Sequence, residues 1–298
     1  MDFSIIIVNY NTIEQTKNCI DSILKYTVDI LYEIILIDNN SSDGSNKYFI
    51  NYPDIKFFQN KENVGFARAN NLGANIATGK YILFLNPDTI LLNNALKYFY
   101  DFFESQDKEK NIGALGCYLL NSDLTLANSY FKFPTILSNF KSELNIILKK
   151  LFKSNFIKNT RINYKGSVRT LEVDYVIGAA LMIKREIFIK INGFDNDFFL
   201  YFEETDIQKR LKLIGFNNYV ITGPKIIHFG GQSSIKDYSY LKYKINYFKS
   251  NFIYFRKHHT FIENLIMRIL ITPLLLRFLF VIKYPKSLRL KLIKLLFK

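Results

Sequence analysis

Cysteine is scarce in this chain of 298 residues, which contains only Cys19 and Cys117. The two lie far apart, and neither belongs to a spacing that is typical of a metal site. A disulfide framework is therefore excluded, and the composition fits a reducing setting. The first residues also lack the basic segment and the long apolar segment of a secretory signal peptide, so we expect a cytoplasmic location.

Glycine is missing where a dinucleotide-binding protein needs it. The first apolar stretch ends in Val8-Asn9-Tyr10-Asn11, whereas a dinucleotide-binding fold would place Gly-x-Gly-x-x-Gly there to seat a pyrophosphate on the helix N-terminus. This absence counts strongly against NAD or FAD as a cofactor. A sugar-nucleotide pyrophosphorylase would need a Gly-rich loop with Arg and Lys at the same place, so that class is disfavoured too.

Acidic residues are nearly absent from the last part of the chain. Residues 241–298 contain 13 Lys or Arg and one acid, Glu263, which leaves +2 of the net charge of +14 on residues 1–240. A nucleic-acid enzyme would be expected to spread its basic residues over its main domain. We therefore predict that no nucleic acid is a partner.

The basic residues of this C-terminal segment alternate with Leu, Ile and Phe. The stretch from Leu265 to Ile282 contains two Arg and a Pro, which makes it a poor membrane-spanning helix. We expect amphipathic helices in the headgroup layer of an anionic membrane, peripheral at the inner face of the cytoplasmic membrane. The alternative is an amphipathic helical hairpin that packs on the main domain or on a partner.

Strand and helix patterns alternate over the first 120 residues, and the apolar content of 49% supports a real core. We expect strands at residues 3–8, 32–37, 55–58, 81–85 and 112–118, with helices between them at residues 13–26, 44–51, 65–77 and 93–105. This alternation predicts right-handed βαβ units and a largely parallel sheet. Residues 121–170 lack clear periodicity, and we interpret them as an insertion over the site. A regular pattern resumes at residues 173–183, with helices expected at 185–191 and 203–213.

The apolar run Tyr81–Leu85 reads as a buried strand and leads into Asn86-Pro87-Asp88-Thr89. A carboxylate just past the C-terminal end of such a strand lies in the crevice where open α/β sheets bind ligands. Asp88 is a hard oxygen donor, suited to Mg²⁺ or Mn²⁺ that also holds phosphate oxygens. The alternative is that Asp88 caps a helix beginning near Thr89.

Two further phrases offer ligand-binding side chains. Asp38 ends the second strand and can accept hydrogen bonds from a nucleoside, while Ser42 or Asp43 can cap the next helix. In Asn63-Val64-Gly65-Phe66-Ala67-Arg68, Gly65 would allow close backbone approach and Arg68 could meet a diphosphate or a base edge. A solvated Arg on an ordinary helix is the alternative.

Four phrases follow one another along the chain: Val8-Asn9-Tyr10-Asn11, the run that begins at Asp38, the phrase that begins at Asn63, and Leu85-Asn86-Pro87-Asp88. Together they resemble the nucleotide-sugar-binding half of family 2 glycosyltransferases of the GT-A fold, above all bacterial rhamnosyltransferase-type members. The resemblance implies that Asp88 binds the divalent cation that bridges the donor diphosphate and that Asp38 contacts the nucleoside. The metal motif of the family is often Asp-x-Asp, but Asn86 stands at its first position and offers a neutral oxygen. The likeness covers about residues 3–235.

The second half of the chain resembles the acceptor side of the same family. After Gly178-Ala179 and a Phe-rich stretch, the acidic pair Glu203-Glu204 opens a helix, and the second acid of that pair is the family's general base. Most relatives carry Asp at the position of Glu204, and Asp206 is the reserve candidate. His228 resembles the His that completes the metal shell. The alternative for these acids is that they complement a helix N-terminus.

The resemblance implies an α/β fold, a GT-A Rossmann-like, mixed and mostly parallel sheet flanked by helices, with a C-terminal basic amphipathic helical extension. The glycosyltransferase domain is expected at residues 1–240, with a nucleotide-sugar half at about 1–120 and an acceptor half at about 170–235, and the membrane-associating tail at 241–298. Candidate catalytic residues are Glu204 and Asp206, and candidate metal ligands for Mg²⁺ or Mn²⁺ are Asp88 and His228. The candidate substrate-binding residues are Asn9, Asn11, Asp38, Asn63, Gly65, Arg68, Asn86, Gly178, Ala179, Glu203 and Arg210.

The expected activity is inverting transfer of a sugar, with rhamnose as a candidate, from a dTDP- or UDP-sugar donor. The expected acceptor is a hydroxyl of a lipid-linked glycan in surface polysaccharide synthesis. The main alternative is a non-catalytic sugar-nucleotide-binding or scaffold protein, because Glu204 replaces the usual Asp.

Overall fold

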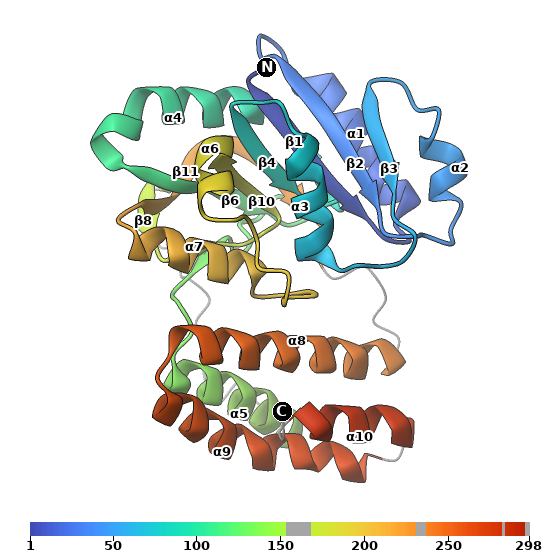
Figure 1. The fold of residues 1–298 in the computed structure, drawn as a ribbon, viewed down its shortest axis with the longest axis vertical. Coiled ribbons are helices and arrows are strands. Elements are labelled where there is room, and N and C mark those ends of the chain that lie inside the picture. The colour runs from blue at the N-terminus through green and yellow to red at the C-terminus, as the bar shows by residue number, and fades with distance from the viewer. Residues whose placement is uncertain (153–167, 231–236, 282–283, 296–298) are drawn as a thin grey trace. The chain divides into compact units, whose positions relative to one another are not determined.

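The computed structural model describes residues 1–152, 168–230, 237–281 and 284–295 (Figure 1). Its contacts divide the chain into two compact units. The α/β unit comprises Met1–Lys132, Tyr164–Phe199 and Glu203–Ser233, and the helical unit comprises Phe133–Asn163, Leu200–Phe202 and Ser234–Lys298. Among the described residues, the contacts thus group 133–152 with the C-terminal segment, while the division expected at residue 240 stays a prediction.

The α/β unit is built on one mixed, mostly parallel sheet, as the sequence predicts. Its strand order is β3-β2-β1-β4-β10-β6-β11-β5, with β8 paired to β11, and a separate pair joins β7 and β9. Strand β10 is antiparallel to both of its neighbours, and β5 and β8 are antiparallel to β11. The bounds are β1 (Phe3–Asn9), β2 (Tyr32–Asp38), β3 (Ile55–Gln59), β4 (Tyr81–Leu85), β5 (Thr89–Leu91), β6 (Ile112–Leu120), β7 (Tyr130–Phe131), β8 (Leu171–Val173), β9 (Tyr175–Val176), β10 (Ala180–Lys184) and β11 (Asn217–His228).

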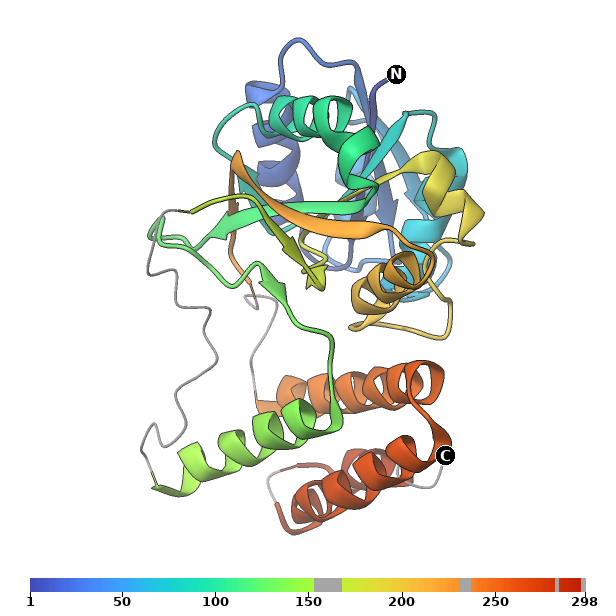
Figure 2. The same ribbon diagram turned by 90° about the vertical axis from the view of Figure 1, so that its left-hand side faces the viewer.

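The central strands are buried on both faces because helices cover both sides of the sheet (Figures 1 and 2). Ile5 and Ile7 of β1 share a core cluster with Ile20 of α1. Ile6 points to the opposite face, where a Cβ on Gly73 of α3 would lie 2.6 Å from it. Apolar runs without alternation are typical of such doubly covered parallel strands. The helices of this unit are α1 (Ile13–Tyr26), α2 (Ser45–Phe49), α3 (Phe66–Ile76), α4 (Ala95–Lys110), α6 (Arg185–Lys190) and α7 (Glu203–Leu213).

One local alternative is wrong. No helix begins near Thr89, because Thr89–Leu91 forms β5 and pairs with the end of β11. The next helix, α4, starts at Ala95. Asp88 therefore precedes a strand and does not cap a helix.

The helical unit contains α5 (Ile136–Phe152), α8 (Asp237–His258), α9 (Phe261–Leu276), the short 3₁₀ helix η1 (Arg277–Phe280) and α10 (Lys286–Lys294). Helix α5 corrects the interpretation of residues 121–170 as an insertion without periodicity; residues 153–167 lie outside the described residues. Its inward face carries the buried polar residues Asn139 and Glu143, which hide the apolar repeat of the helix. Within the part of the chain that is described, no helix has the length and apolar character that a membrane span needs.

A buried ion pair joins α5 to α8. Nζ of Lys244 lies 2.8 Å from Oε1 of Glu143, and both side chains are almost completely buried. The rings of Tyr240, Tyr247 and Phe248 surround the ammonium group at 5.3–6.0 Å from their centroids. Burial lowers the pKa of Lys244, and the carboxylate of Glu143 opposes that effect.

Replacing Glu143 by Ala should destabilise the helical unit, because a buried ammonium group would lose its counter-ion. We expect the free energy of unfolding to fall by about 3–5 kcal/mol, measured by urea denaturation with circular dichroism. The surface pair of the partly buried Lys212 and the exposed Glu172 provides the control, and Glu172→Ala should cost less than about 1 kcal/mol. Equal effects of the two substitutions would contradict the assignment. The double variant Glu143→Leu, Lys244→Met should recover most of the stability.

Candidate functional site

Asp88, Asn86 and His228 meet at the junction of β4, β5 and β11. Pairing of β5 with the end of β11 sets Thr89 opposite His228. Nε2 of His228 lies 3.3 Å from Oδ1 of Asp88 and 3.4 Å from Nδ2 of Asn86. The backbone N–H of Phe229 donates to the carbonyl of Asp88 at 3.0 Å. Three residues expected to act together, although far apart in the sequence, are thus brought into one cluster, which we call the Asp88 cluster.

The donor set of the Asp88 cluster fits a divalent cation that is shared with a ligand. The side chains of Asp88 and His228 are each partly exposed. No group of three or more His, Cys, Asp or Glu side chains forms a metal site among the described residues. Mg²⁺ prefers oxygen ligands and keeps several waters, being held in proteins by one or two carboxylates and substrate phosphates. A cation at Asp88 would therefore need further oxygens from a bound diphosphate and water.

Asp38 and Asn9 form a buried network at the ends of β2 and β1. The carboxylate of Asp38 accepts hydrogen bonds from Nδ2 of Asn9 at 2.6 Å and from the N–H and hydroxyl of Ser41. Oδ1 of Asn9 in turn accepts from the hydroxyls of Thr12 and Thr16. Both side chains are fully buried. The network fixes the loops that follow the two strands, and the contact of Asp38 with a nucleoside stays a prediction.

The neighbouring loop residues also hold each other in place. The backbone of Asn11 has a φ of 56°. Its side-chain Oδ1 accepts a hydrogen bond from the N–H of Ser42 at 2.7 Å. The carboxylate of Asp43 accepts from the N–H of Ile13 and from the N–H of Ser45 at the start of α2. Asp43 is thus structural, as expected. Asn11 is exposed at the same edge, where it can reach a ligand.

Gly65 serves a contact inside the protein. Its φ is 88°, and a Cβ there would lie 2.5 Å from the carbonyl oxygen of Phe199. That oxygen accepts a hydrogen bond from the N–H of Phe66 at 2.7 Å, and Oδ1 of Asn63 accepts one from the N–H of Gly65. The start of α3 therefore needs glycine to bind the Phe199 segment closely.

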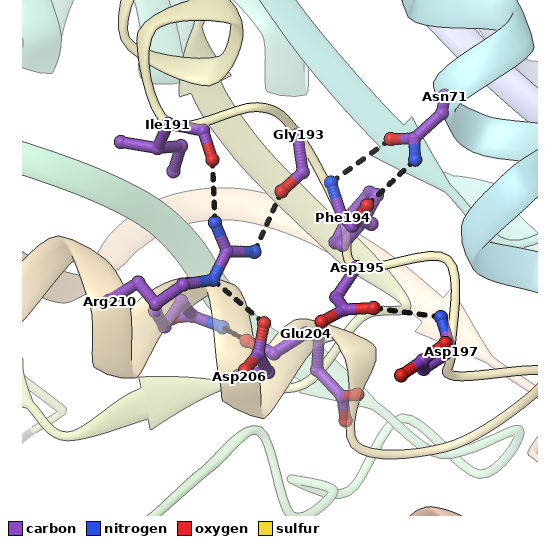
Figure 3. A network of polar contacts seen from close by, with 10 residues as sticks. Asn71, Ile191, Gly193, Phe194, Asp195, Asp197, Glu204, Asp206 and Arg210 are labelled. Atoms are coloured by element: carbon purple, nitrogen blue, oxygen red, sulfur yellow. Dashed lines mark hydrogen bonds and ion pairs between the residues drawn. The ribbon is translucent and has the colours of Figure 1, made fainter. Parts of the chain in front are cut away.

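Helix α3 also binds the segment before Phe199, through Asn71 (Figure 3). The side-chain amide of Asn71 donates to the carbonyl of Phe194 at 2.8 Å and accepts from its N–H at 3.0 Å. Nε of the exposed Arg68 donates to the carbonyl of Asn196. Asn71 is not among the predicted site residues, although it lies three residues after Arg68. An Asn in the middle of a helix is a signal that could have marked it.

Arg210 and Asp206 brace the turn that ends α6. Nε of Arg210 lies 2.8 Å from Oδ2 of the buried Asp206, and its two terminal nitrogens donate to the carbonyls of Ile191 and Gly193 (Figure 3). The side chain of Glu204 points away from this pair. Asp206 is engaged by Arg210 and Glu204 is not, so the geometry favours Glu204 over Asp206 as the candidate base.

The two acids at the start of α7 differ in environment. Glu203 is buried, and its Oε2 atom has no hydrogen-bond partner within the described part of the chain. Burial and the nearby charge of Glu204 raise the pKa of Glu203 well above its usual range. Glu204 is half-buried. The two acids are therefore coupled, and burial disfavours the charged form of Glu203.

Gly178 and Ala179 connect the Asp88 cluster with this acid pair. Strand β10 runs antiparallel to β4, which brings the start of β10 beside the end of β4. The N–H of Asn86 donates to the carbonyl of Ala179 at 3.0 Å. A Cβ on Gly178 would lie 3.4 Å from Cβ of Glu204, so that the two residues are in near contact. Adjacent residues thus contact both groups of functional side chains.

Comparison with known proteins finds two matching family models and several related enzymes. The family model described as glycosyl transferase family 2 matches residues 4–191, and the model described as the N-terminal domain of galactosyltransferase matches residues 162–247. Rhamnosyltransferase WbbL of Escherichia coli is 27% identical over 76% of this chain and 82% of its own length. N-acetylglucosaminyl-diphospho-decaprenol L-rhamnosyltransferase of Mycobacterium tuberculosis is 20% identical over 76% of this chain and 75% of its own length.

Solved structures share the fold at lower identity. Mannosyltransferase PcManGT of Pyrobaculum calidifontis, in complex with GDP-Man and Mn²⁺, has a TM-score of 0.53 at 15% identity over 86% of this chain and 63% of that chain. Staphylococcus aureus TarS 1–349 in complex with UDP has a TM-score of 0.52 at 15% identity over 94% of this chain and 72% of that chain. With the family model matching most of the α/β unit, the chain belongs to glycosyl transferase family 2 and is a glycosyltransferase with a GT-A fold.

Proposed function

We propose that the protein transfers a sugar from a nucleoside-diphosphate sugar to a hydroxyl acceptor with inversion at the anomeric carbon, and that the transfer depends on a divalent metal ion. The observation that carries the proposal is the link through Gly178 and Ala179. Gly178 lies against Glu204, and the next residue, Ala179, accepts a hydrogen bond from Asn86 of the Asp88 cluster. This supports a base and a metal ion on either side of the reacting bond, as a single displacement between donor and acceptor requires.

In the proposed mechanism, Glu204 accepts the proton of the acceptor hydroxyl. The acceptor oxygen forms a bond to the anomeric carbon as the bond to the diphosphate oxygen breaks, and the nucleoside diphosphate leaves with that electron pair. Asp88 and His228 would hold a Mn²⁺ or Mg²⁺ ion, which supplies positive charge that offsets the charge of the leaving diphosphate. Burial and the charge of Glu204 raise the pKa of Glu203, which disfavours two negative charges on the acid pair.

The supporting residues act by positioning. Arg210 and Asp206 fix the turn before the acidic helix, and Asn71 with Gly65 fixes the segment that leads to it. Asn9 and Asp38 fix the loops after β1 and β2, where the nucleoside is proposed to bind. Asn63, Arg68 and Asn11 remain candidates for contacts with the donor.

The donor is proposed to be a dTDP- or UDP-sugar, with rhamnose as the first sugar to test. Two relatives are named rhamnosyltransferases, and the name of one includes a decaprenol-linked acceptor. The TarS structure in complex with UDP supports UDP-sugars as the other choice. We infer that the acceptor is a lipid-linked glycan for a bacterial surface polysaccharide. The basic C-terminal helices are proposed to hold the enzyme at the inner face of the cytoplasmic membrane, where this acceptor lies.

A non-catalytic sugar-nucleotide-binding protein is the alternative to this proposal. Glu204 is the feature that keeps it open, because most relatives carry Asp at this position. A protein of that kind would bind UDP or dTDP in calorimetry without turnover of any donor. Measurable donor turnover by the wild-type protein excludes it.

Replacing Asp88 by Ala should remove the cation dependence of donor binding. We expect kcat to fall at least about 10²-fold, because the charge of the leaving diphosphate is no longer offset. Donor turnover with Mn²⁺ and calorimetry of UDP and dTDP with and without Mn²⁺ measure both effects. Asp101→Ala, which removes an exposed partner of Lys97, is the control and should leave both unchanged. Full activity of Asp88→Ala would exclude the metal role.

Replacing Glu204 by Gln should abolish proton acceptance while leaving donor binding intact. We expect kcat to fall about 10²–10⁴-fold with an unchanged dissociation constant for the nucleotide and an unchanged unfolding temperature. Asp206→Asn should instead lower the unfolding temperature, because Arg210 would lose its ion pair. Glu204→Asp should keep measurable activity, since relatives carry Asp there. Equal turnover of Glu204→Gln and the wild type would refute the assignment of the base.

The raised pKa of Glu203 predicts a stability effect of definite sign. The folded protein holds this proton to higher pH than the unfolded chain does, so stability decreases as pH rises from the usual glutamate pKa of about 4.3 towards the folded pKa. Glu203→Gln should therefore raise the unfolding temperature at about pH 8 more than at about pH 4.5. A thermal melt series across this range measures it. A gain that is independent of pH would show that Glu203 is ionised in the folded protein.

A further inference from the structure

Helix α9 is apolar on two opposite faces. One face, with Met267, Ile271 and Leu275, is buried where α9 packs against α5 and α8. The capping box between Thr260 and Glu263 fixes the start of the helix. The helix is therefore held in place by one apolar face, and the other needs a separate explanation.

The other face is exposed and has no charge. We name it the α9 stripe; its members are Phe261, Ile262, Leu265, Ile266, Ile269, Pro273 and Leu276. At about 100° per residue they fall within an arc of about 140°, and Glu263 and Arg268 lie outside it. Ile262 and Ile269 are 67% and 61% exposed. A contiguous apolar face of this kind marks a binding surface.

The charge of the helical unit identifies the kind of surface that fits it. By sequence this unit has 20 Lys and Arg and three acids, a net charge of +17, whereas the α/β unit has 20 and 23, a net charge of −3. Exposed cations lie next to α9 in the chain, at Arg256 and Lys257, and on α10, at Lys286, Lys291 and Lys294. A second copy of this unit would bring an equal positive charge, while an anionic lipid surface would neutralise it.

We propose that the α9 stripe inserts into the headgroup region of an anionic bilayer, with the surrounding Lys and Arg contacting the lipid phosphates. This deepens the proposed function, on which it rests for the lipid-linked acceptor, by assigning membrane contact to one helix face. An apolar face that enters the acyl boundary beside basic residues is the general arrangement of interfacial helices. Binding then has an apolar part, which persists at high salt, and an electrostatic part, which salt weakens.

The absence of tryptophan from the sequence allows a direct test of insertion. The variants Ile262→Trp and Ile269→Trp, each in the full chain, are mixed with vesicles of phosphatidylcholine alone or with phosphatidylglycerol. We expect a blue shift of the tryptophan emission, and quenching by lipids brominated on the upper acyl chain, with the anionic vesicles. Leu213→Trp is the control, because Leu213 is 68% exposed in the α/β unit, and its emission should not change. Unshifted emission from both stripe positions would overturn the proposal.

Charge substitutions test whether the stripe drives binding. The double variant Ile266→Glu, Ile269→Glu should lower partition onto anionic vesicles at least about tenfold, because two charges would replace inserted apolar groups. The matched control is Leu213→Glu, Ile214→Glu, which makes the same charge change at exposed residues of the α/β unit. Both variants should keep the wild-type unfolding temperature and donor turnover.

Two further results would overturn the proposal. Equal vesicle binding of the two double variants would show that net charge alone binds the membrane. Sedimentation that reveals a dimer, lost in Ile266→Glu, Ile269→Glu while vesicle binding persists, would assign the stripe to a second copy. Vesicle partition is measured without donor, so a failure of the transfer reaction would leave this test intact, and a failure of docking would leave turnover of a detergent-solubilised acceptor intact.

Discussion

The rest of the site depends on strand β10, which enters the sheet antiparallel between two strands of the opposite direction. Its direction brings the residues before it to the carboxyl end of β4. Ala179 can then accept a hydrogen bond from Asn86, and Gly178 can lie against Glu204. In an all-parallel sheet these residues would lie at the other edge. One strand direction thus brings the residues that contact the proposed base and the Asp88 cluster to the same edge of the sheet.

A second constraint on the site is the set of hydrogen bonds from Arg210 and Asn71 that fixes the position of helix α7. Arg210 uses its ion pair with Asp206 to aim two further donors at the turn after α6. Asn71 and the start of α3 bind the segment that follows this turn. A charge-assisted hydrogen bond to a buried carboxylate is stronger than a neutral one. Arg210 therefore makes the strongest of the contacts that fix this part of the site. Helix α7, which carries Glu204, is therefore fixed through the turn after α6 and through the segment that α3 binds.

Much of this arrangement could be predicted from the sequence, and the exceptions share a cause. The parallel strands and most helices follow from apolar runs, and the position of Asp88 follows from its strand. The helix α5 was missed because Asn139 and Glu143 are polar where the helix is buried. The role of Asn71 was missed because its partner, Phe194, lies 123 residues away. Hydrophobic periodicity indicates which residues are buried because they are apolar. It does not reveal polar residues that pair with partners far away in the sequence.

The helical unit combines these two kinds of exception. Inside, Lys244, Glu143 and Asn251 are buried, although each costs free energy to remove from water. Outside, the apolar α9 stripe faces solvent, which forgoes the gain from burial. The ion pair and the hydrogen bond that Oδ1 of Asn251 accepts from Asn139 offset part of the first cost within the protein. Contact with the apolar part of a bilayer would remove the α9 stripe from water. The net charge of +17 on this unit favours an anionic lipid surface over a second copy.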